Sequence, residues 1–277
     1  MSTAGFSTAA AVTWGGSDFA GGYGARRAPS QLIVVSGHLV SFALLLAVCL
    51  GLRLPFPHQA GMWFAVAGGF EGSLALAVFY RALAMGAMGL TAACTGLLTA
   101  LVPVLFSMLR EGFPGAGVLS GIGVGLVAIW LITRQPAEHG QKTPALALLL
   151  GALSGCGFGA QLIFFKLAGS CGLLWTMTSA RAAGSLAMLL VIAVAPPKGA
   201  WKGFWRMGVL AGMLDTVGNL FYICATQRGR LDVAAMISSL YPAVTILLAG
   251  ALLHERPNKR QLAGMALALV AVLLLSR

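Results

Sequence analysis

Charged residues are scarce in this sequence, and acidic residues are the scarcest. The 277 residues include seven Asp and Glu, and charged residues make up 9% of the chain, against roughly 25% in a typical soluble domain. Such a chain has too few charges to cover a globule exposed to water. Hydrophobic residues make up 58% of it and gather in long runs. The composition therefore excludes a soluble globular protein and predicts an integral membrane protein.

Motifs of catalysis are missing as well. The sequence has no HExxH, no GxSxG, no cluster of metal ligands and no lysine-containing phosphate loop of an ATP-driven pump. We therefore expect no enzyme activity, no cofactor and no metal. The five cysteines lie in or beside apolar runs, without metal-ligand spacing, and are interpreted as small buried hydrophobic residues.

The net charge of +11 does not indicate a nucleic-acid partner. Lys and Arg occur in ones to threes at the ends of apolar runs, as in membrane proteins, and no tract concentrates them. No cleavable signal peptide is recognised, so the first apolar run is expected to remain as a helix. The spans predict both termini on the same side, while the distribution of basic residues leaves that side open.

Ten apolar segments are long enough to cross a bilayer, which requires roughly 20 residues for each helix. They are expected near residues 3–23, 31–52, 60–84, 88–109, 116–133, 144–167, 171–195, 205–227, 231–252 and 261–276. The breaks between them carry Pro, Gly and charge, and none holds a soluble domain. Any function must therefore lie inside the helix bundle or at its two mouths.

The two halves of the chain resemble each other at an offset of about 142–144 residues. "FYRALAMGAMGLTAA" aligns with "FYICATQRGRLDVAA", and "REGFPGAGVLSGIGVGLVAIWL" aligns with "HERPNKRQLAGMALALVAVLLL". This predicts one membrane domain with two repeats, 1–134 and 143–277, of five helices each. Because five is odd, the second repeat enters the membrane from the opposite side, so the repeats are inverted, as in many secondary transporters.

Four stretches identify a family resemblance: "WGGSDF", "FYRAL", "SSLYPAVTILLAGALLHER" and "QLAGMALALVAVLLL". With them the whole chain resembles the EamA-type transporters of the drug/metabolite transporter superfamily. The resemblance implies a ten-helix carrier with a central cavity that moves small organic solutes by alternating access. It does not imply a particular substrate. One departure is that Pro103 is displaced by about five residues from the position that matches Pro242.

The first apolar segment carries an aspartate in its interior. Trp14, Ser17, Asp18 and Gly21 share one helical face. A charge at the bilayer centre costs about 2.5–3.5 kcal/mol on insertion scales, so it is retained where it faces protein or water. We interpret this face as a cavity wall; the alternative is an Asp18 solvated near the interface.

A second polar face lies on segment 205–227. Asp215, Asn219 and Tyr222 share it, and the repeat aligns Tyr222 with Tyr80. We expect these residues, together with Gln161 of the sixth segment, to line the same cavity. The alternative for Asp215 and Asn219 is a hydrogen-bonded structural pair.

Two further intramembrane charges lack an obvious location. Glu71 and Arg181 lie near the middle of their segments, and buried charges tend to pair. Arg181 is expected to pair with Glu71, Asp18 or Asp215, and the sequence does not select one. Since low dielectric favours the protonated form of a carboxylate, Asp18, Asp215 and Glu71 are candidate proton carriers, with Asp18 favoured.

The ninth segment is expected to break at Pro242, because proline frees the carbonyl four residues earlier, that of Ser238. Ser238 and Tyr241 are therefore candidates for the cavity or a hinge, with a plain kink as the alternative. His38, alone in the second segment, is interpreted as a packing residue.

These features together predict a secondary active transporter of a small organic solute or metabolite, with protons as the coupling ion if transport is ion-coupled. The expected partners are a small-molecule substrate and the lipid bilayer, in a bacterial inner (cell) membrane. An intramembrane enzyme or a channel is the alternative.

Overall fold

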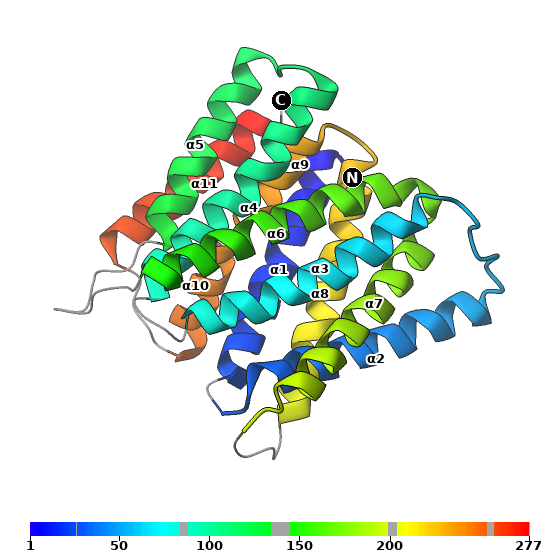
Figure 1. Ribbon diagram of the computed structural model, residues 1–277. Helices are drawn as coiled ribbons and strands as arrows, with labels where there is room; N and C mark the ends of the chain where they lie inside the picture. The colour runs from blue at the N-terminus through cyan, green and yellow to red at the C-terminus, as the bar shows by residue number, and fades with distance from the viewer. Residues whose placement is uncertain (26, 84–87, 134–144, 199–203, 254–257, 277) are drawn as a thin grey trace.

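Helices form the regular structure of the chain in a computed structural model, which describes residues 1–25, 27–83, 88–133, 145–198, 204–253 and 258–276 (Figure 1). Their bounds are α1 Thr3–Ala25, α2 Ser30–Gly51, α3 Met62–Leu83, α4 Met88–Glu111, α5 Ala116–Thr133, α6 Ala145–Ala168, α7 Leu173–Val194, α8 Phe204–Thr226, α9 Leu231–Ser238, α10 Tyr241–Leu253 and α11 Lys259–Leu275. A single 3-10 turn, Gly169–Cys171, joins α6 to α7. The described residues contain no strand, as the all-helical prediction requires.

Eight segments of the described chain are long and apolar enough to cross a membrane. They correspond to α2 through α8 and to α9 and α10 taken together. The helix α11 is 17 residues long, and α1 carries the polar and small residues between Trp14 and Gly22 that lower its hydropathy. The chain is therefore an integral membrane protein, and the ten-span count is matched directly for eight spans.

The two membrane prolines act differently. The ninth predicted segment is divided into α9 and α10, with Ser239 and Leu240 between them and Pro242 in the first turn of α10. Proline fits this position because its missing N–H is not needed in a first turn. Pro103 instead lies inside a continuous α4.

Contacts between the two halves of the chain come in matched pairs. The helix α1 packs against α8, and α6 packs against α3. The helix α2 likewise packs against α8 as α7 does against α3, and α1 packs against α9 and α10 as α6 does against α4. In each pair of contacts, a helix of one half is replaced by the corresponding helix of the other half. For example, α1 and α6 are the first helices of their halves and α3 and α8 are the third, so the contact of α1 with α8 matches that of α6 with α3.

Glycine contacts show the same exchange at the level of atoms. A Cβ placed on Gly212 would lie 2.3 Å from the Gly37 Cα, and one placed on Gly69 would lie 2.1 Å from the Ala180 carbonyl oxygen. The two pairs are related by a shift of about 143 residues. Small residues at these positions let the helix backbones touch. Two further sets of contacts are related in the same way: Gly15–Val244 with Gly159–Val102, and Gly121–Leu275 with Gly264–Ile132.

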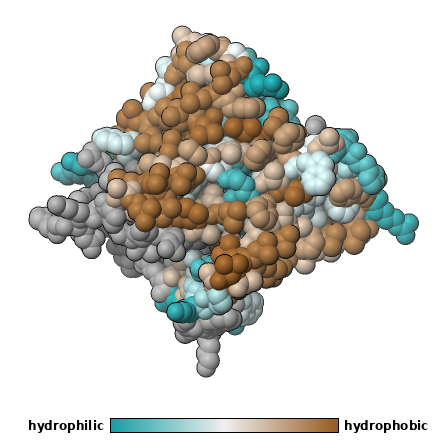
Figure 2. Space-filling view, in the orientation of Figure 1, coloured by the Kyte–Doolittle hydropathy of each residue, from teal (hydrophilic) through white to brown (hydrophobic). Residues whose placement is uncertain are grey.

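The surface separates into hydrophobic and hydrophilic regions. In Figure 2 hydrophobic residues cover most of the visible face, and hydrophilic residues gather mainly at its edges. Exposed apolar side chains such as Trp63, Leu109 and Val194 belong to this outer surface. Such a distribution suits contact with lipid around the bundle.

Candidate functional site

A cavity of about 350 Å³ lies between helices of both halves. Its walls come from α1, α2 and α3 of the first half and from α6, α7 and α8 of the second, with Thr99 of α4 and Tyr241 of α10 completing them. The same helices make the matched contacts between the halves, so the cavity lies at their interface.

Most of the residues singled out in the sequence line this cavity. The lining includes Trp14, Ser17, Asp18, Gln161, Asp215, Asn219 and Tyr241. The helical face predicted on α1 therefore points inward. The sequence analysis did not anticipate His38 in this wall, nor the aromatic residues Phe79, Phe158 and Phe165. The sequence signal for His38 in the wall was that it is a lone histidine among the apolar residues of α2.

Two predicted cavity residues, Tyr222 and Ser238, have other positions. Tyr222 is fully buried behind the wall, where its ring packs against Trp14 at 5.7 Å and its hydroxyl donates to the Leu162 carbonyl. Ser238 is buried at the end of α9, with its hydroxyl 3.4 Å from the Ser7 carbonyl oxygen. Both hydroxyls thus serve helix packing. The side chain of Tyr80 lies outside the described residues.

Asp215 is the acidic partner of Arg181. The Arg181 guanidinium donates through Nη2 to Asp215 Oδ2, and Asn219 donates to the same oxygen at 3.1 Å. Arg181 is buried, whereas the Asp215 side chain retains 35% of its exposure toward the cavity. Asp215 therefore both lines the cavity and forms a hydrogen-bonded pair with Asn219. The structure selects this partner because α7 and α8 face each other across the cavity.

Asp18 has a different environment. It lines the same cavity and repels Asp215 electrostatically, yet within the described part of the chain no side chain or backbone group donates a hydrogen bond to its carboxylate. Its neighbour Ser17 uses its hydroxyl to bond the Ala211 carbonyl at 2.9 Å. Asp18 is thus an acceptor without a protein partner, facing open space.

Glu71 lies outside the cavity lining. Its carboxylate is wedged between α3 and α6, where a Cβ on Gly157 would lie 2.3 Å from Oε1. Its Oε2 atom is buried without a hydrogen-bond partner in the described residues. The arrangement removes Glu71 as the partner of Arg181 and separates it from the solute space.

A serine and a histidine do meet in the wall. The Nδ1 atom of His38 lies 3.4 Å from the Ser73 hydroxyl, and both side chains are buried. Ser73, however, donates its hydroxyl hydrogen to the Gly69 carbonyl oxygen at 2.9 Å. A nucleophilic serine must donate that hydrogen to its base, so this pair is not arranged for acyl transfer.

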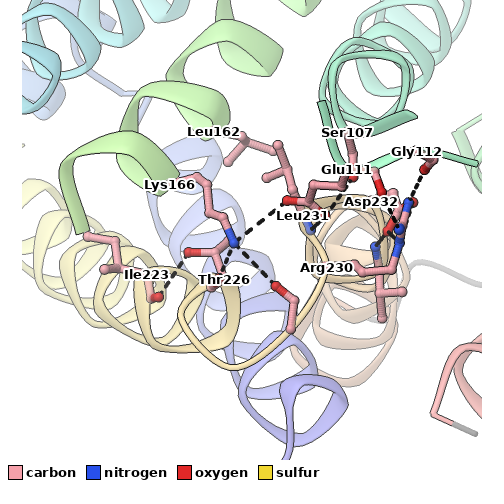
Figure 3. A network of polar contacts seen from close by, with 12 residues as sticks. Ser107, Glu111, Gly112, Leu162, Lys166, Ile223, Thr226, Arg230, Leu231 and Asp232 are labelled. Carbon is pink, nitrogen blue, oxygen red and sulfur yellow. Dashed lines mark hydrogen bonds and ion pairs between the residues drawn. The ribbon is translucent and has the colours of Figure 1, made fainter. Parts of the chain in front are cut away.

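One end of the bundle carries a second group of charges, called here the clasp: Glu111, Lys166, Arg230 and Asp232 (Figure 3). Glu111 Oε2 accepts hydrogen bonds from the Ser107 hydroxyl at 3.1 Å and from the Leu231 backbone N–H at 3.3 Å. The clasp therefore joins the end of α4 to the start of α9.

The other clasp residues, Lys166, Arg230 and Asp232, also have protein partners. Lys166 lies 3.8 Å from Glu111 and donates to the carbonyl oxygens of Thr226 and Gly229. Arg230 binds both oxygens of the fully buried Asp232 and donates to the Gly112 carbonyl oxygen at 2.7 Å. The described residues contain no group of three or more His, Cys, Asp or Glu side chains placed to hold a metal ion.

Comparisons with known proteins agree with this architecture. The model of the EamA-like transporter family matches residues 145–277. No curated protein matches the sequence significantly. One solved structure, titled only "Crystal structure of protein", superposes with a TM-score of 0.81, covering 98% of this chain and 95% of that chain at 16% sequence identity.

At that identity the solved structure supports the fold alone, and the family match covers the second half of the chain. Residues 145–277 are therefore similar to the EamA-like transporter family, and the long apolar helices make the chain an integral membrane protein.

Proposed function

We propose that this protein is a secondary transporter that carries a small organic solute through the central cavity by alternating access. The observation that carries the proposal is the cavity itself, which both halves build and which contains an unpartnered carboxylate, Asp18. An intramembrane charge of this kind is typical of transport pathways. The family match adds that related proteins are transporters.

We further propose that the protein is a single membrane domain of ten helices in two inverted repeats, 1–134 and 143–277. The exchanged helix contacts and the glycine pairs support this arrangement. In inverted-repeat transporters the two halves rock about a site at their interface, which exposes the cavity to each side in turn. We place the protein in a bacterial inner (cell) membrane.

Protons are the proposed coupling ion, and Asp18 is the proposed carrier. Asp215 is already held in an ion pair by Arg181. Glu71 does not face the solute space. Asp18 is the carboxylate in the cavity wall that is free to load and release a proton as access alternates.

Flux in proteoliposomes tests the proposal. Vesicles that contain the purified chain are loaded with a pH indicator and challenged with a panel of small organic solutes under an imposed pH gradient. We expect at least one solute to drive saturable proton movement and to show counterflow, which a channel would not. In Asp18→Asn, gradient-driven flux should fall to the level of empty vesicles while exchange at equal pH continues.

A matched control is Glu138→Gln, which changes a carboxylate in the part of the sequence between the two repeats. It should leave flux unchanged. Gradient-driven flux at the native rate in Asp18→Asn would contradict the role of Asp18. If no solute in the panel shows saturable, protein-dependent flux, the transporter proposal fails.

A further inference from the structure

The charges in the cavity wall do not balance. Among the described lining residues, Asp18 and Asp215 are acidic and Arg181 is the one Lys or Arg. Arg181 is committed to Asp215. With His38 neutral, the wall therefore carries one surplus negative charge, at Asp18. An uncompensated charge in a cavity inside the membrane must be neutralised by a proton or by a bound cation.

The other polar groups of the wall are already engaged. The hydroxyls of Ser17, Thr99 and Thr245 each donate to a backbone carbonyl oxygen, and Asn219 donates to Asp215. Among the described lining residues, unoccupied hydrogen-bonding capacity remains on the neutral amide of Gln161, on Nε of the ion-paired Arg181, which is buried, and on the carboxylate of Asp18. The wall thus offers an incoming solute an acceptor and a negative charge.

Aromatic rings line the same cavity as this acceptor. Trp14 lies one helical turn before Asp18 on the same face of α1, and its ring meets that of Tyr241 edge-on at 6.3 Å. Across the cavity, Phe158 and Phe79 make a second edge-to-face pair at 6.0 Å. Aromatic faces attract organic cations, and most strongly those of Trp.

We infer that the solute is a monovalent organic cation, a quaternary ammonium or a protonated amine with an apolar body, whose positive centre lies between Asp18 and Trp14. This inference rests on the proposed function and names its substrate class. Cation and proton then compete for one carboxylate, so that a cation leaves Asp18 as a proton arrives. The exchange of one monovalent cation for one proton balances in charge.

Binding to the full-length protein in nanodiscs tests the inference, with protein-free nanodiscs subtracted. The probes are phenyltrimethylammonium, its neutral isostere tert-butylbenzene and the anion benzenesulfonate. We expect saturable binding of the cation, at least about tenfold tighter than either of the other two, which corresponds to about 1.4 kcal/mol. Equal or tighter binding of the neutral or anionic probe would overturn the inference.

Variants separate the proposed site from nonspecific uptake. Asp18→Asn should weaken cation binding at least about tenfold, and Asp18→Glu should retain it. Trp14→Leu should weaken it less than Asp18→Asn does, and Glu138→Gln should leave it unchanged. Cation binding that is the same in Asp18→Asn as in the native chain would also overturn the inference, provided that both proteins melt at the same temperature.

The outcome is distinguishable from a failure of the proposed function. If proteoliposomes carry a neutral or anionic solute while the cation does not bind, the substrate class is wrong and the transporter stands. If the cation binds at Asp18 but no solute crosses the membrane, the binding site stands and the transporter is wrong.

The charged groups that face Asp18 are known for each helix around the cavity. They are Asp215 on α8, Arg181 on α7 and His38 on α2, while Glu71 on α3 lies outside the cavity. A pH series of cation binding therefore includes Asp18→Asn as its reference, since any pH dependence that survives in this variant belongs to those other groups.

Discussion

Two groups of charges in this protein contain the same residue types but differ in how their carboxylates are hydrogen-bonded. The clasp has two carboxylates and two cations, and each carboxylate accepts several hydrogen bonds. The cavity wall has two carboxylates and one arginine, and Asp18 accepts no hydrogen bond from the described protein. The carboxylates of the clasp therefore have protein partners without a ligand, whereas Asp18 in the cavity has none among the described residues.

This difference separates structure from function. A carboxylate whose partners are all protein groups is held in one state, and its loss costs stability. A carboxylate that lacks partners has to be neutralised by something that comes and goes, such as a proton or a cationic solute. The comparison predicts that variants of the clasp change stability and variants of Asp18 change binding and transport.

Changing the pH should separate the two groups most strongly. Once Asp18 is protonated, phenyltrimethylammonium affinity should fall by about tenfold for each further unit of acidification, because proton and cation compete for one site. Calorimetric titration over a pH series measures this. Affinity that is flat with pH in the native chain would contradict the competition, and Asp18→Asn should already be flat.

Arg230 of the clasp should keep its charge in the same pH series. The hydrogen bond with the Asp232 carboxylate raises the pKa of Arg230 above its ordinary value. A raised pKa means that the stabilisation is fully present below the unfolded-state pKa and is lost only as the pH rises through the folded-state pKa. Arg230 therefore stays charged throughout the acidification and contributes no pH dependence of its own to the melting temperature.

Arg181→Met should cause the largest loss of stability. Removing one member of a buried ion pair costs about 3–5 kcal/mol, and we expect the lower part of this range or less because Asp215 is partly exposed. Thermal melting in detergent measures the loss. The double variant Arg181→Met/Asp215→Asn should recover much of it, since no unpaired charge remains; additive losses would contradict the assigned pair.

Asp232→Asn should have the next largest effect on stability. It removes the carboxylate that binds Arg230 and accepts the Val233 backbone N–H at 2.8 Å, and a buried group left without its partner costs about 1–3 kcal/mol. Binding of phenyltrimethylammonium by the folded fraction should remain unchanged. A loss of cation affinity comparable to that of Asp18→Asn would break the separation between clasp and cavity.

Lys166→Met should have the smallest effect. Its ammonium group is about 28% exposed and lies 3.8 Å from Glu111, a distance typical of weak ion pairs worth less than about 1 kcal/mol. Melting temperatures measure the change, with Arg228→Met, an exposed residue near the same end, as the reference. A loss larger than that of Asp232→Asn would mean that Lys166, and not Arg230, holds the clasp together.

Composition and spacing predicted much of this molecule. Long apolar runs with few charges require helices in a membrane, because lipid offers no partner for unpaired backbone groups. The 3.6-residue period placed Trp14, Ser17 and Asp18 on one face, and the structure turns that face into the cavity. The break of the ninth segment follows from the geometry of Pro242.

Other features depended on how the helices pack. Tyr222 shares a helical face with Asp215 and Asn219, yet it is buried behind Trp14, because the facing helix α1 and not the helical period decides how far a cavity extends. The clasp likewise depends on packing, since Glu111 and Arg230 are 119 residues apart in the sequence.

The sequence by itself determined that this chain lies in a membrane, that its halves resemble each other and that Asp18 faces something other than lipid. Those conclusions rest on local composition and on the cost of placing a charge in hydrocarbon. The tertiary structure alone decided that Arg181 pairs with Asp215 and leaves Asp18 without a partner among the described residues. Three acidic residues were compatible with Arg181 in the sequence, and only the packing of α7 against α8 brings one of them within reach of the guanidinium.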